Sequence, residues 1–157
     1  AFELDQSLEQ LELHELIPST NEPDDSEEEK VELPQDCRVL FVDDDVILRR
    51  LFSRAIKRVA PSWIVQEAAS GEAALTLVQE EMFDLIFMDQ YMASIEKQLL
   101  GTETVSAMRA SGVSSRICGL SANDVEENFT KAGADFFALK PMSSKTDILH
   151  AELCRTL

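Results

Sequence analysis

The sequence predicts an α/β fold in which helices cover both faces of a parallel β-sheet. From Cys37 onward, short apolar runs alternate with segments whose apolar residues follow helical spacing. The run 85–88 is continuously apolar, which is typical of a strand buried on both faces. Hydrophobic residues make up 45% of the 157-residue chain, enough for one domain with a substantial core.

Five strand–helix pairs account for residues 37–157. The predicted strands are residues 38–42, 63–65, 83–89, 116–120 and 136–139. The predicted helices are residues 46–59, 71–80, 102–110, 124–131 and 143–155. Right-handed crossovers between parallel strands would place these helices on both faces of the sheet.

The first predicted helix is strongly amphipathic. Its apolar face consists of Leu48, Leu51, Phe52, Ala55 and Val59. Its basic residues, expected mostly on the outside, are Arg49, Arg50, Lys57 and Arg58. We expect Asp45 to cap the amino end of this helix and Pro61 to close it.

The later helices have start and stop signals of their own. Ser70 is a natural N-cap for the second helix. A polar loop leads from the third strand to Gly101, which precedes the third helix. Asn123 or Asp124 can cap the fourth helix, and Gly133 is expected to end it.

Residues 1–36 form an acidic amino-terminal extension. They contain 13 acidic residues and one lysine, so they carry −12 of the net charge of −16. This charge argues against binding nucleic acid or an anionic membrane through the extension. Residues 18–36, which hold three prolines and an acidic run, are expected to be a solvated linker.

Residues 1–17 carry leucines among acids, and Leu4, Leu8 and Leu11 follow helical spacing up to Pro18. One interpretation is a linker helix without a function of its own. The other is a helix that docks on the domain or on a second copy of the chain, which would give a homodimer.

Three cysteines, Cys37, Cys118 and Cys154, have spacings that fit no metal site. We therefore expect reduced thiols in a reducing compartment, the cytoplasm. No apolar run approaches the ~20 residues of a membrane span, and no signal-peptide pattern is present. The chain begins at Ala1, which suits a processed protein or a piece of a longer one.

Polar side chains follow several predicted strands at the point where each strand ends. Asp43 and Asp44 follow the first strand, Asp89 ends the third, and Ser121 and Lys140 follow the fourth and fifth. The carboxyl ends of parallel strands meet at one edge, where ligands bind in open α/β sheets. Because crowded carboxylates repel one another, this edge is expected to hold a cation.

Four motifs in this order resemble the receiver domain of two-component response regulators. They are Val39-Leu40-Phe41-Val42-Asp43-Asp44-Asp45, Asp84-Leu85-Ile86-Phe87-Met88-Asp89-Gln90-Tyr91-Met92, Leu120-Ser121-Ala122 and Leu139-Lys140-Pro141-Met142. The resemblance covers residues 37–157. It implies a flavodoxin-like, doubly wound parallel sheet of five strands in the order 2-1-3-4-5.

The resemblance also implies a chemistry. Asp89 would be the phosphoacceptor, taking a phosphoryl group from a phosphohistidine on a histidine kinase or histidine phosphotransfer protein. Asp43, Asp44, Asp89 and the backbone carbonyl of Tyr91 would hold Mg²⁺. Such a domain receives a phosphoryl group and is not itself an enzyme.

Further roles follow from the same resemblance. Lys140 and the Ser121 hydroxyl would contact phosphoryl oxygens, with Ala122 as the small residue of the binding site beside them. Phe137, three residues before Lys140, occupies the position of the switch aromatic. Movement of Ser121 and Phe137 would change the surface formed by the fourth helix, fifth strand and fifth helix. The alternative for Phe137 is a plain core residue.

Two other functions remain to be weighed. Phosphatases of the haloacid dehalogenase type show acidic, hydroxyl and lysine motifs in the same order, but they need a further acidic motif, and they leave Asp89 unexplained. For that motif only Asp147 and Glu152 remain, on a predicted helix. A receiver-like docking module that works without phosphorylation is a third class, against which the complete set of site residues argues.

The context of the domain is a separate question. An acidic linker precedes the predicted domain, and no output domain follows its last helix. This arrangement suits the C-terminal receiver of a hybrid histidine kinase, and a stand-alone regulator is the alternative.

Overall fold

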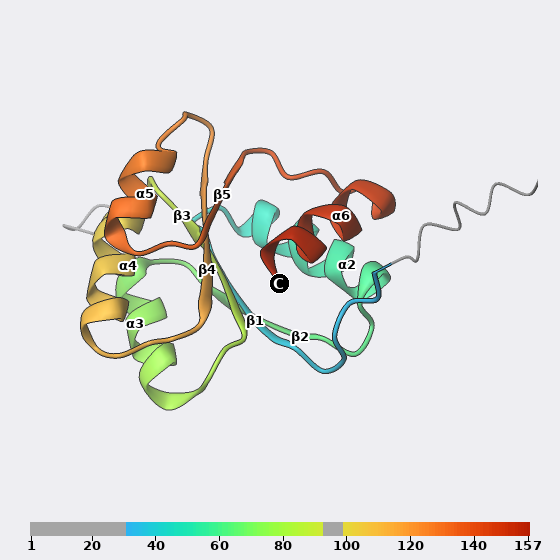
Figure 1. The fold of residues 1–157 in the computed structure, drawn as a ribbon, viewed down its shortest axis with the longest axis horizontal. Helices are drawn as coiled ribbons and strands as arrows, with labels where there is room; N and C mark the ends of the chain where they lie inside the picture. The colour runs from blue at the N-terminus through green and yellow to red at the C-terminus, as the bar shows by residue number, and fades with distance from the viewer. Residues whose placement is uncertain (1–30, 93–98) are drawn as a thin grey trace, which may run out of the picture. The chain divides into compact units, whose positions relative to one another are not determined.

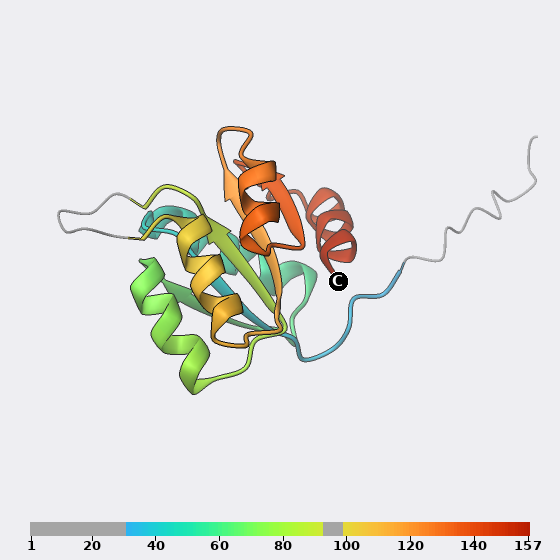
Figure 2. The same cartoon turned by 60° about the vertical axis from the view of Figure 1, so that its left-hand side comes forward.

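The computed structural model describes residues 31–92 and 99–157 of the chain. Its five parallel strands form one sheet in the order β2-β1-β3-β4-β5, with helices on both faces (Figure 1, Figure 2). The predicted flavodoxin-like fold and strand order are confirmed. The predicted helix within residues 1–17 lies outside the described residues, as does most of the predicted linker.

The secondary structure alternates between strand and helix throughout. The strands are β1 (Arg38–Val42), β2 (Ile64–Ala68), β3 (Leu85–Asp89), β4 (Arg116–Ser121) and β5 (Phe136–Leu139). The helices are α2 (Val46–Val59), α3 (Gly71–Glu80), α4 (Gly101–Ala110), α5 (Glu126–Ala132) and α6 (Thr146–Thr156).

Two layers of helices enclose the sheet. Helices α2 and α6 cover one face, and α3, α4 and α5 cover the other (Figure 1). Alternate residues of β1 serve the two cores: Val39 and Phe41 belong to the cluster under α2 and α6, whereas Leu40 and Val42 belong to the opposite cluster. Every residue of β3 is buried, as expected for the central strand of a doubly wound sheet.

Strand β2 is longer than predicted. The prediction of residues 63–65 is wrong, because the strand begins at Ile64 and continues to Ala68. Gln66 pairs in register with Leu40, and Ala68 with Val42. As β2 lies at the edge of the sheet, it accommodates polar residues that hide its strand pattern in the sequence.

Three of the predicted helix signals are confirmed, and one is wrong. Asp45 accepts hydrogen bonds from the first turn of α2, Ser70 accepts one from Ala73 N at 3.1 Å, and Gly133 ends α5 with a φ of 112°. Neither Asn123 nor Asp124 caps α5. The N-cap is Val125, without a side-chain bond, and Asp124 instead accepts from Glu126 N at 3.3 Å in a local turn.

The buried stripe of α2 differs from the predicted one. Leu51 was assigned to the apolar face, but it is 51% exposed, whereas Ile56 is fully buried. The buried stripe of α2 is centred on Phe52, Ala55 and Ile56. At about 100° per residue, Leu51 lies roughly a quarter turn from that centre and faces solvent. Arg49 was placed mostly outside, yet its side chain is only 15% exposed.

The compact body begins at Leu33 and extends to Leu157. Leu33 packs against the core cluster under α2 and α6, and the indole nitrogen of Trp63 donates to Pro34 O at 2.7 Å. Cys37, Cys118 and Cys154 all lie within the described residues, and none of them forms a disulfide. Within residues 31–92 and 99–157, no helix combines the length and apolar character needed to cross a bilayer.

Candidate functional site

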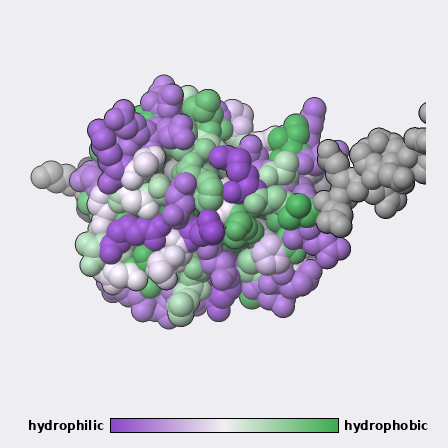
Figure 3. Space-filling view, viewed as in Figure 1, coloured by the Kyte–Doolittle hydropathy of each residue, from purple (hydrophilic) through white to green (hydrophobic). Residues whose placement is uncertain are grey.

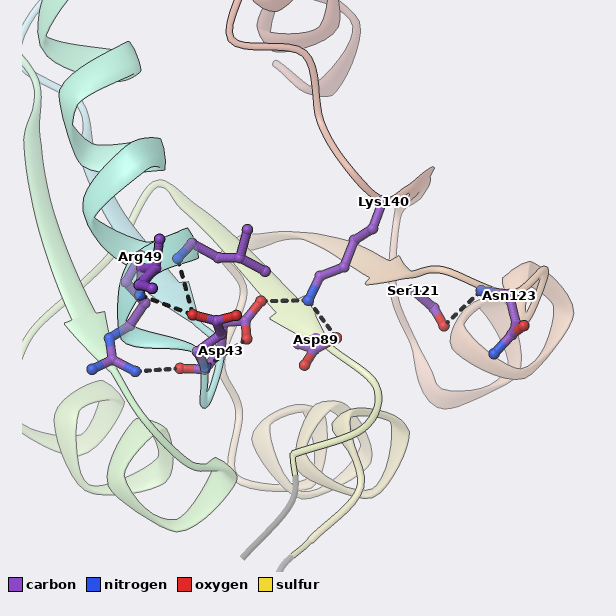
Figure 4. A network of polar contacts seen from close by, with 9 residues as sticks. Asp43, Arg49, Asp89, Ser121, Asn123 and Lys140 are labelled. Atoms are coloured by element: carbon purple, nitrogen blue, oxygen red, sulfur yellow. Dashed lines mark hydrogen bonds and ion pairs between the residues drawn. The ribbon is translucent and has the colours of Figure 1, made fainter.

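The carboxyl edge of the sheet gathers the predicted acidic residues. Asp43 and Asp44 follow β1, and Asp89 is the last residue of the neighbouring strand β3 (Figure 4). One carboxylate oxygen from each of the three residues lies within 4.8 Å of the others. Asp43 and Asp89 are buried, and Asp44 is half-buried. The sheet therefore brings three carboxylates to one point, as predicted.

Lys140 reaches this cluster from the end of β5. Its ammonium forms ion pairs with Asp43 Oδ2 and with Asp89 Oδ1, the latter at 3.0 Å (Figure 4). Its backbone N–H donates to Ser121 O at 2.9 Å, because β4 and β5 pair up to Ser121 and Leu139. The pairing of two strands thus fixes the backbone from which the ammonium reaches two carboxylates.

The site also shifts the pKa values of its members. Burial raises the pKa of Asp89 from its ordinary 3.8 to about 6, opposed by the Lys140 hydrogen bond and reinforced by Asp43. Burial acts to lower the pKa of Lys140, but its hydrogen bonds to Asp43 and Asp89 raise that pKa above its ordinary value. Lys140 therefore stays charged, and one ammonium faces three carboxylates.

Arg49 belongs to the site, although helical periodicity predicts that it lies on the outside of its helix. Its Nη1 donates to the backbone oxygen of Asp43 at 2.6 Å (Figure 4), and its Nε lies 3.3 Å from Glu67 Oε1. It thereby links the turn that carries Asp43 to the end of β2. Arg49 lies four residues after the Asp45 N-cap, in the first turn of α2 and next to this edge. That spacing is the feature of the sequence that could have placed Arg49 in the site.

Ser121 and Ala122 lie at the adjacent strand end. Ser121, the last residue of β4, is buried, and its hydroxyl oxygen accepts a hydrogen bond from Asn123 N at 3.2 Å (Figure 4). Leu120, just before Ser121, pairs in register with Asp89. Ala122 is exposed. Ser121 and Ala122 thus follow the residue that pairs with Asp89 along the sheet edge.

Phe137 lies on β5, three residues before Lys140. Its ring is half-buried and packs at 5.9 Å between centroids against Phe129 of α5. Phe129 in turn is fully buried and covers Gly119, where a Cβ atom would lie 2.4 Å from the ring. The aromatic pair therefore connects β5 to the packing of α5 on β4.

Gln90 and Tyr91, the two residues that follow Asp89, differ in how far they are buried. Gln90 is buried at 3% exposure and bonds to Thr102 at the start of α4, whereas Tyr91 exposes 56% of its surface. The resemblance to receivers implies a role for the backbone carbonyl of Tyr91, whereas no sequence motif points to Gln90. No pattern marks a buried glutamine in advance, because its burial depends on where α4 begins.

A mainly apolar cavity of about 450 Å³ opens beside the site. Its lining includes Leu48 and Leu51 of α2 and, after β5, Pro141 and Met142. Exposed apolar residues Ile47 and Leu51 lie on the same helix. In the view of Figure 3, hydrophobic residues lie at the surface in separate patches among hydrophilic ones.

The sequence of this domain matches a known protein family whose members carry acids and a lysine at this sheet edge. Residues 39–152 match the family model of the response regulator receiver domain. The chain belongs to this family. Receivers generally act as phosphoacceptors without enzymatic activity of their own, bind Mg²⁺ at an aspartate cluster and interact with histidine kinases or phosphotransfer proteins.

Individual plant receivers are identical to this chain at about a third of the aligned positions. The two-component response regulator ORR41 of Oryza sativa subsp. japonica is 33% identical over 113 residues, covering 69% of this chain and 86% of ORR41. The two-component response regulator ARR22 of Arabidopsis thaliana is 38% identical over 111 residues, covering 67% of this chain and 74% of ARR22.

Bacterial relatives add a size comparison and a solved structure. The nitrate/nitrite response regulator protein NarL of Escherichia coli strain K12 is 32% identical over 116 residues, covering 72% of this chain and 51% of NarL. The chain thus spans about half the length of that regulator. The chemotaxis response regulator CheY4 of Vibrio cholerae superposes with a TM-score of 0.67 at 27% identity, covering 78% of this receiver and 100% of CheY4.

The raised pKa of Asp89 predicts a stability effect in the metal-free receiver. A carboxyl group that ionises at 3.8 when unfolded and at about 6 when folded binds its proton more tightly in the folded state. Its contribution therefore destabilises the fold as the pH rises from about 4 to 6. At pH 7.5 without Mg²⁺, we expect Asp89→Asn to raise the free energy of unfolding by on the order of 2 kcal/mol.

Urea unfolding in a chelating buffer at pH 7.5 and pH 4.5 tests this effect. The gain from Asp89→Asn should shrink at the lower pH, where the parent carboxyl is protonated. Asp124→Asn, at an exposed position near the same edge, is the control and should give a similar small effect at both pH values. An equal gain at both pH values for Asp89→Asn would contradict the assigned cause.

Proposed function

We propose that Asp89 accepts a phosphoryl group from a phosphohistidine and that the receiver transmits this event through its surface. The observation that supports it most directly is the position of Asp89. It ends the fully buried central strand, shares its site with two further carboxylates, and lies 3.0 Å from the Lys140 ammonium. Keeping a buried carboxylate ionised costs free energy, so its presence at this position supports a functional role for the charge.

The donor atoms suit Mg²⁺. This ion prefers oxygen ligands and retains several waters, so a few carboxylates on one side of it are sufficient. Asp43, Asp44 and Asp89 would hold it together with the backbone carbonyl of Tyr91, and one ammonium among three carboxylates leaves negative charge to be neutralised. When bound, Mg²⁺ supplies positive charge that offsets the repulsion between an anionic donor and the carboxylates.

The chain's own residues perform the remaining steps. Asp89 would attack the phosphorus of a phosphohistidine whose other ring nitrogen is protonated. The P–N bond then breaks as the P–O bond forms, giving an acyl phosphate on Asp89 and a neutral imidazole on the donor. Lys140, already poised over Asp89, would pair with a phosphoryl oxygen. A hydroxyl has both donor and acceptor capacity, so Ser121 can accept from Asn123 and still donate to the phosphoryl group near Ala122.

The same hydroxyl would couple phosphorylation to the surface. Movement of Ser121 toward the phosphoryl group releases space at the end of β4, and Phe137 would turn into it from β5. Because Phe137 packs on Phe129, its rotation would disturb the packing of α5. The α5–β5–α6 surface would then be the one that reports the phosphorylated state.

The phosphodonor would be a histidine kinase or a histidine phosphotransfer protein, the latter if the domain belongs to a hybrid kinase. A protein donor needs apolar surface to bury beside Asp89. Exposed Ile47 and Leu51 on α2 and the adjoining cavity provide such a surface. The two acids that follow Lys140 do not favour a phosphatase of the haloacid dehalogenase type: Asp147 is exposed on α6, and Glu152 pairs with Arg155 at 2.7 Å.

The experiment is incubation of the full chain with acetyl phosphate and Mg²⁺, followed by intact mass measurement. We expect one phosphoryl group to be added, and none when a chelator removes the metal. Parallel incubation with a phosphorylated histidine phosphotransfer protein tests the natural class of donor. A chain that gains no phosphoryl group from either donor would contradict the proposed function.

A further inference from the structure

Gln90, the residue directly after Asp89, uses all of its polar groups. Its side-chain oxygen accepts from Thr102 N at 2.9 Å, and its side-chain nitrogen lies 3.3 Å from Thr102 Oγ1. Its backbone oxygen accepts from Gly101 N at 2.9 Å, and its backbone N–H donates to Leu120 O at 3.0 Å. We call the two side-chain hydrogen bonds to Thr102 the Gln90 clamp.

The clamp holds the amino end of α4 directly against the exit of β3. A Cβ atom on Gly101 would lie 2.0 Å from Asp89 O and 2.9 Å from the Cα of Gln90, so only glycine allows this approach. Gly101 therefore lies directly beside Gln90, and both are next to Asp89.

The clamp also replaces a missing helix cap. Leu100 is the N-cap of α4 and has no polar side chain, so the Gln90 oxygen accepts the N–H of Thr102 in its place. Glu103 Oε1 accepts the N–H of Leu100 at 3.0 Å at the same helix end. The side chains of Gln90 and Glu103 thus both stabilise the amino end of α4. Of these two, Gln90 is the one that directly follows Asp89.

We propose that Gln90 is a positioning residue for the metal: its clamp fixes the Gln90–Tyr91 backbone so that the carbonyl of Tyr91 is ready to bind Mg²⁺. This rests on the proposed function, in which that carbonyl is a ligand. A buried residue with all polar groups paired cannot rotate without losing hydrogen bonds, and the peptide that joins Gln90 to Tyr91 is held with it. This limits the positions that the Tyr91 carbonyl can take. Partners of metal ligands typically change metal affinity about 10–100-fold when they are lost.

The test measures Mg²⁺ binding to the full chain by titration calorimetry for the parent, Gln90→Met, Thr102→Val and Glu103→Met. Methionine matches the length of glutamine but makes no hydrogen bonds. We expect Gln90→Met to weaken Mg²⁺ binding about tenfold. Thr102→Val keeps the backbone N–H and should weaken it less. Glu103→Met removes the other cap bond and should lower thermal stability while leaving Mg²⁺ affinity unchanged.

A kinetic measurement separates positioning from folding. Phosphorylation by acetyl phosphate should need more Mg²⁺ in Gln90→Met for half-maximal rate, with a maximal rate close to that of the parent. If the parent binds Mg²⁺ and Gln90→Met binds it equally well, the positioning role is wrong and the proposed function stands. Equal weakening in Glu103→Met would also overturn it, because the effect would then be general stability. A parent that binds no Mg²⁺ would overturn both.

Discussion

Asp89→Asn is expected to reduce phosphorylation by acetyl phosphate and Mg²⁺ to background. Asparagine keeps the shape of the side chain but removes the anionic oxygen that attacks phosphorus. Asp43, Asp44 and Lys140 remain in the variant, so it keeps two of the three carboxylates proposed to hold Mg²⁺ and the ammonium beside them. Incubation at saturating Mg²⁺ compensates for the lost ligand, so that the remaining loss reflects the missing nucleophile. Intact mass measurement, with peptide mapping of the parent, identifies the modified residue.

The matched control is Asp84→Asn. Asp84 directly precedes β3, so it lies at the opposite end of the strand that Asp89 terminates, and it accepts from Arg38 N at 2.8 Å. Asparagine can accept the same bond, and we expect normal phosphorylation of this variant. A phosphoryl group that persists in Asp89→Asn would show that another residue is the acceptor. Its appearance on Asp43 would favour the dehalogenase-type phosphatase instead.

The site residues that the sequence predicted share one property. Asp43, Asp89 and Lys140 each follow an apolar run, and parallel pairing brings strand ends together whatever the details of packing. The strand order is therefore enough to predict that these three residues lie close together, and the resemblance to receivers gives that order. The ion pairs of Lys140 with both acids could not be predicted from spacing, because they depend on where the side chain points.

Arg49 and Gln90 were missed for a different physical reason. Helical periodicity places Arg49 beside the polar residues of α2, but the turn after β1 brings its guanidinium back over Asp43 O. The burial of Gln90 follows from the way α4 approaches β3, which the local sequence does not encode. Similarly, Leu51 is exposed because the orientation of α2 on the sheet, and not its periodicity alone, decides which side of the stripe is covered.

Mg²⁺ should stabilise the receiver strongly, and Asp44→Asn should remove most of that stabilisation. A ligand that binds only the folded state at 100 times its dissociation constant adds about 2.7 kcal/mol. For a domain of this size that corresponds to a rise in melting temperature of roughly 5–10 °C. Asp44 supplies one of three carboxylates in the cluster, so its neutralisation should weaken binding and reduce the increment to a small part of the parent value.

Asp45→Asn provides a control one residue away. Asp45 accepts hydrogen bonds from Ile47 N and Leu48 N as the N-cap of α2, and asparagine caps a helix about as well as aspartate. This variant should therefore retain the full Mg²⁺ increment in a thermal melt, even though it loses the same charge from the same turn. Equal increments in Asp44→Asn and the parent would place the metal elsewhere. A loss in Asp45→Asn equal to that in Asp44→Asn would mean that the metal responds to the net charge of the turn and not to the particular carboxylates at the strand ends.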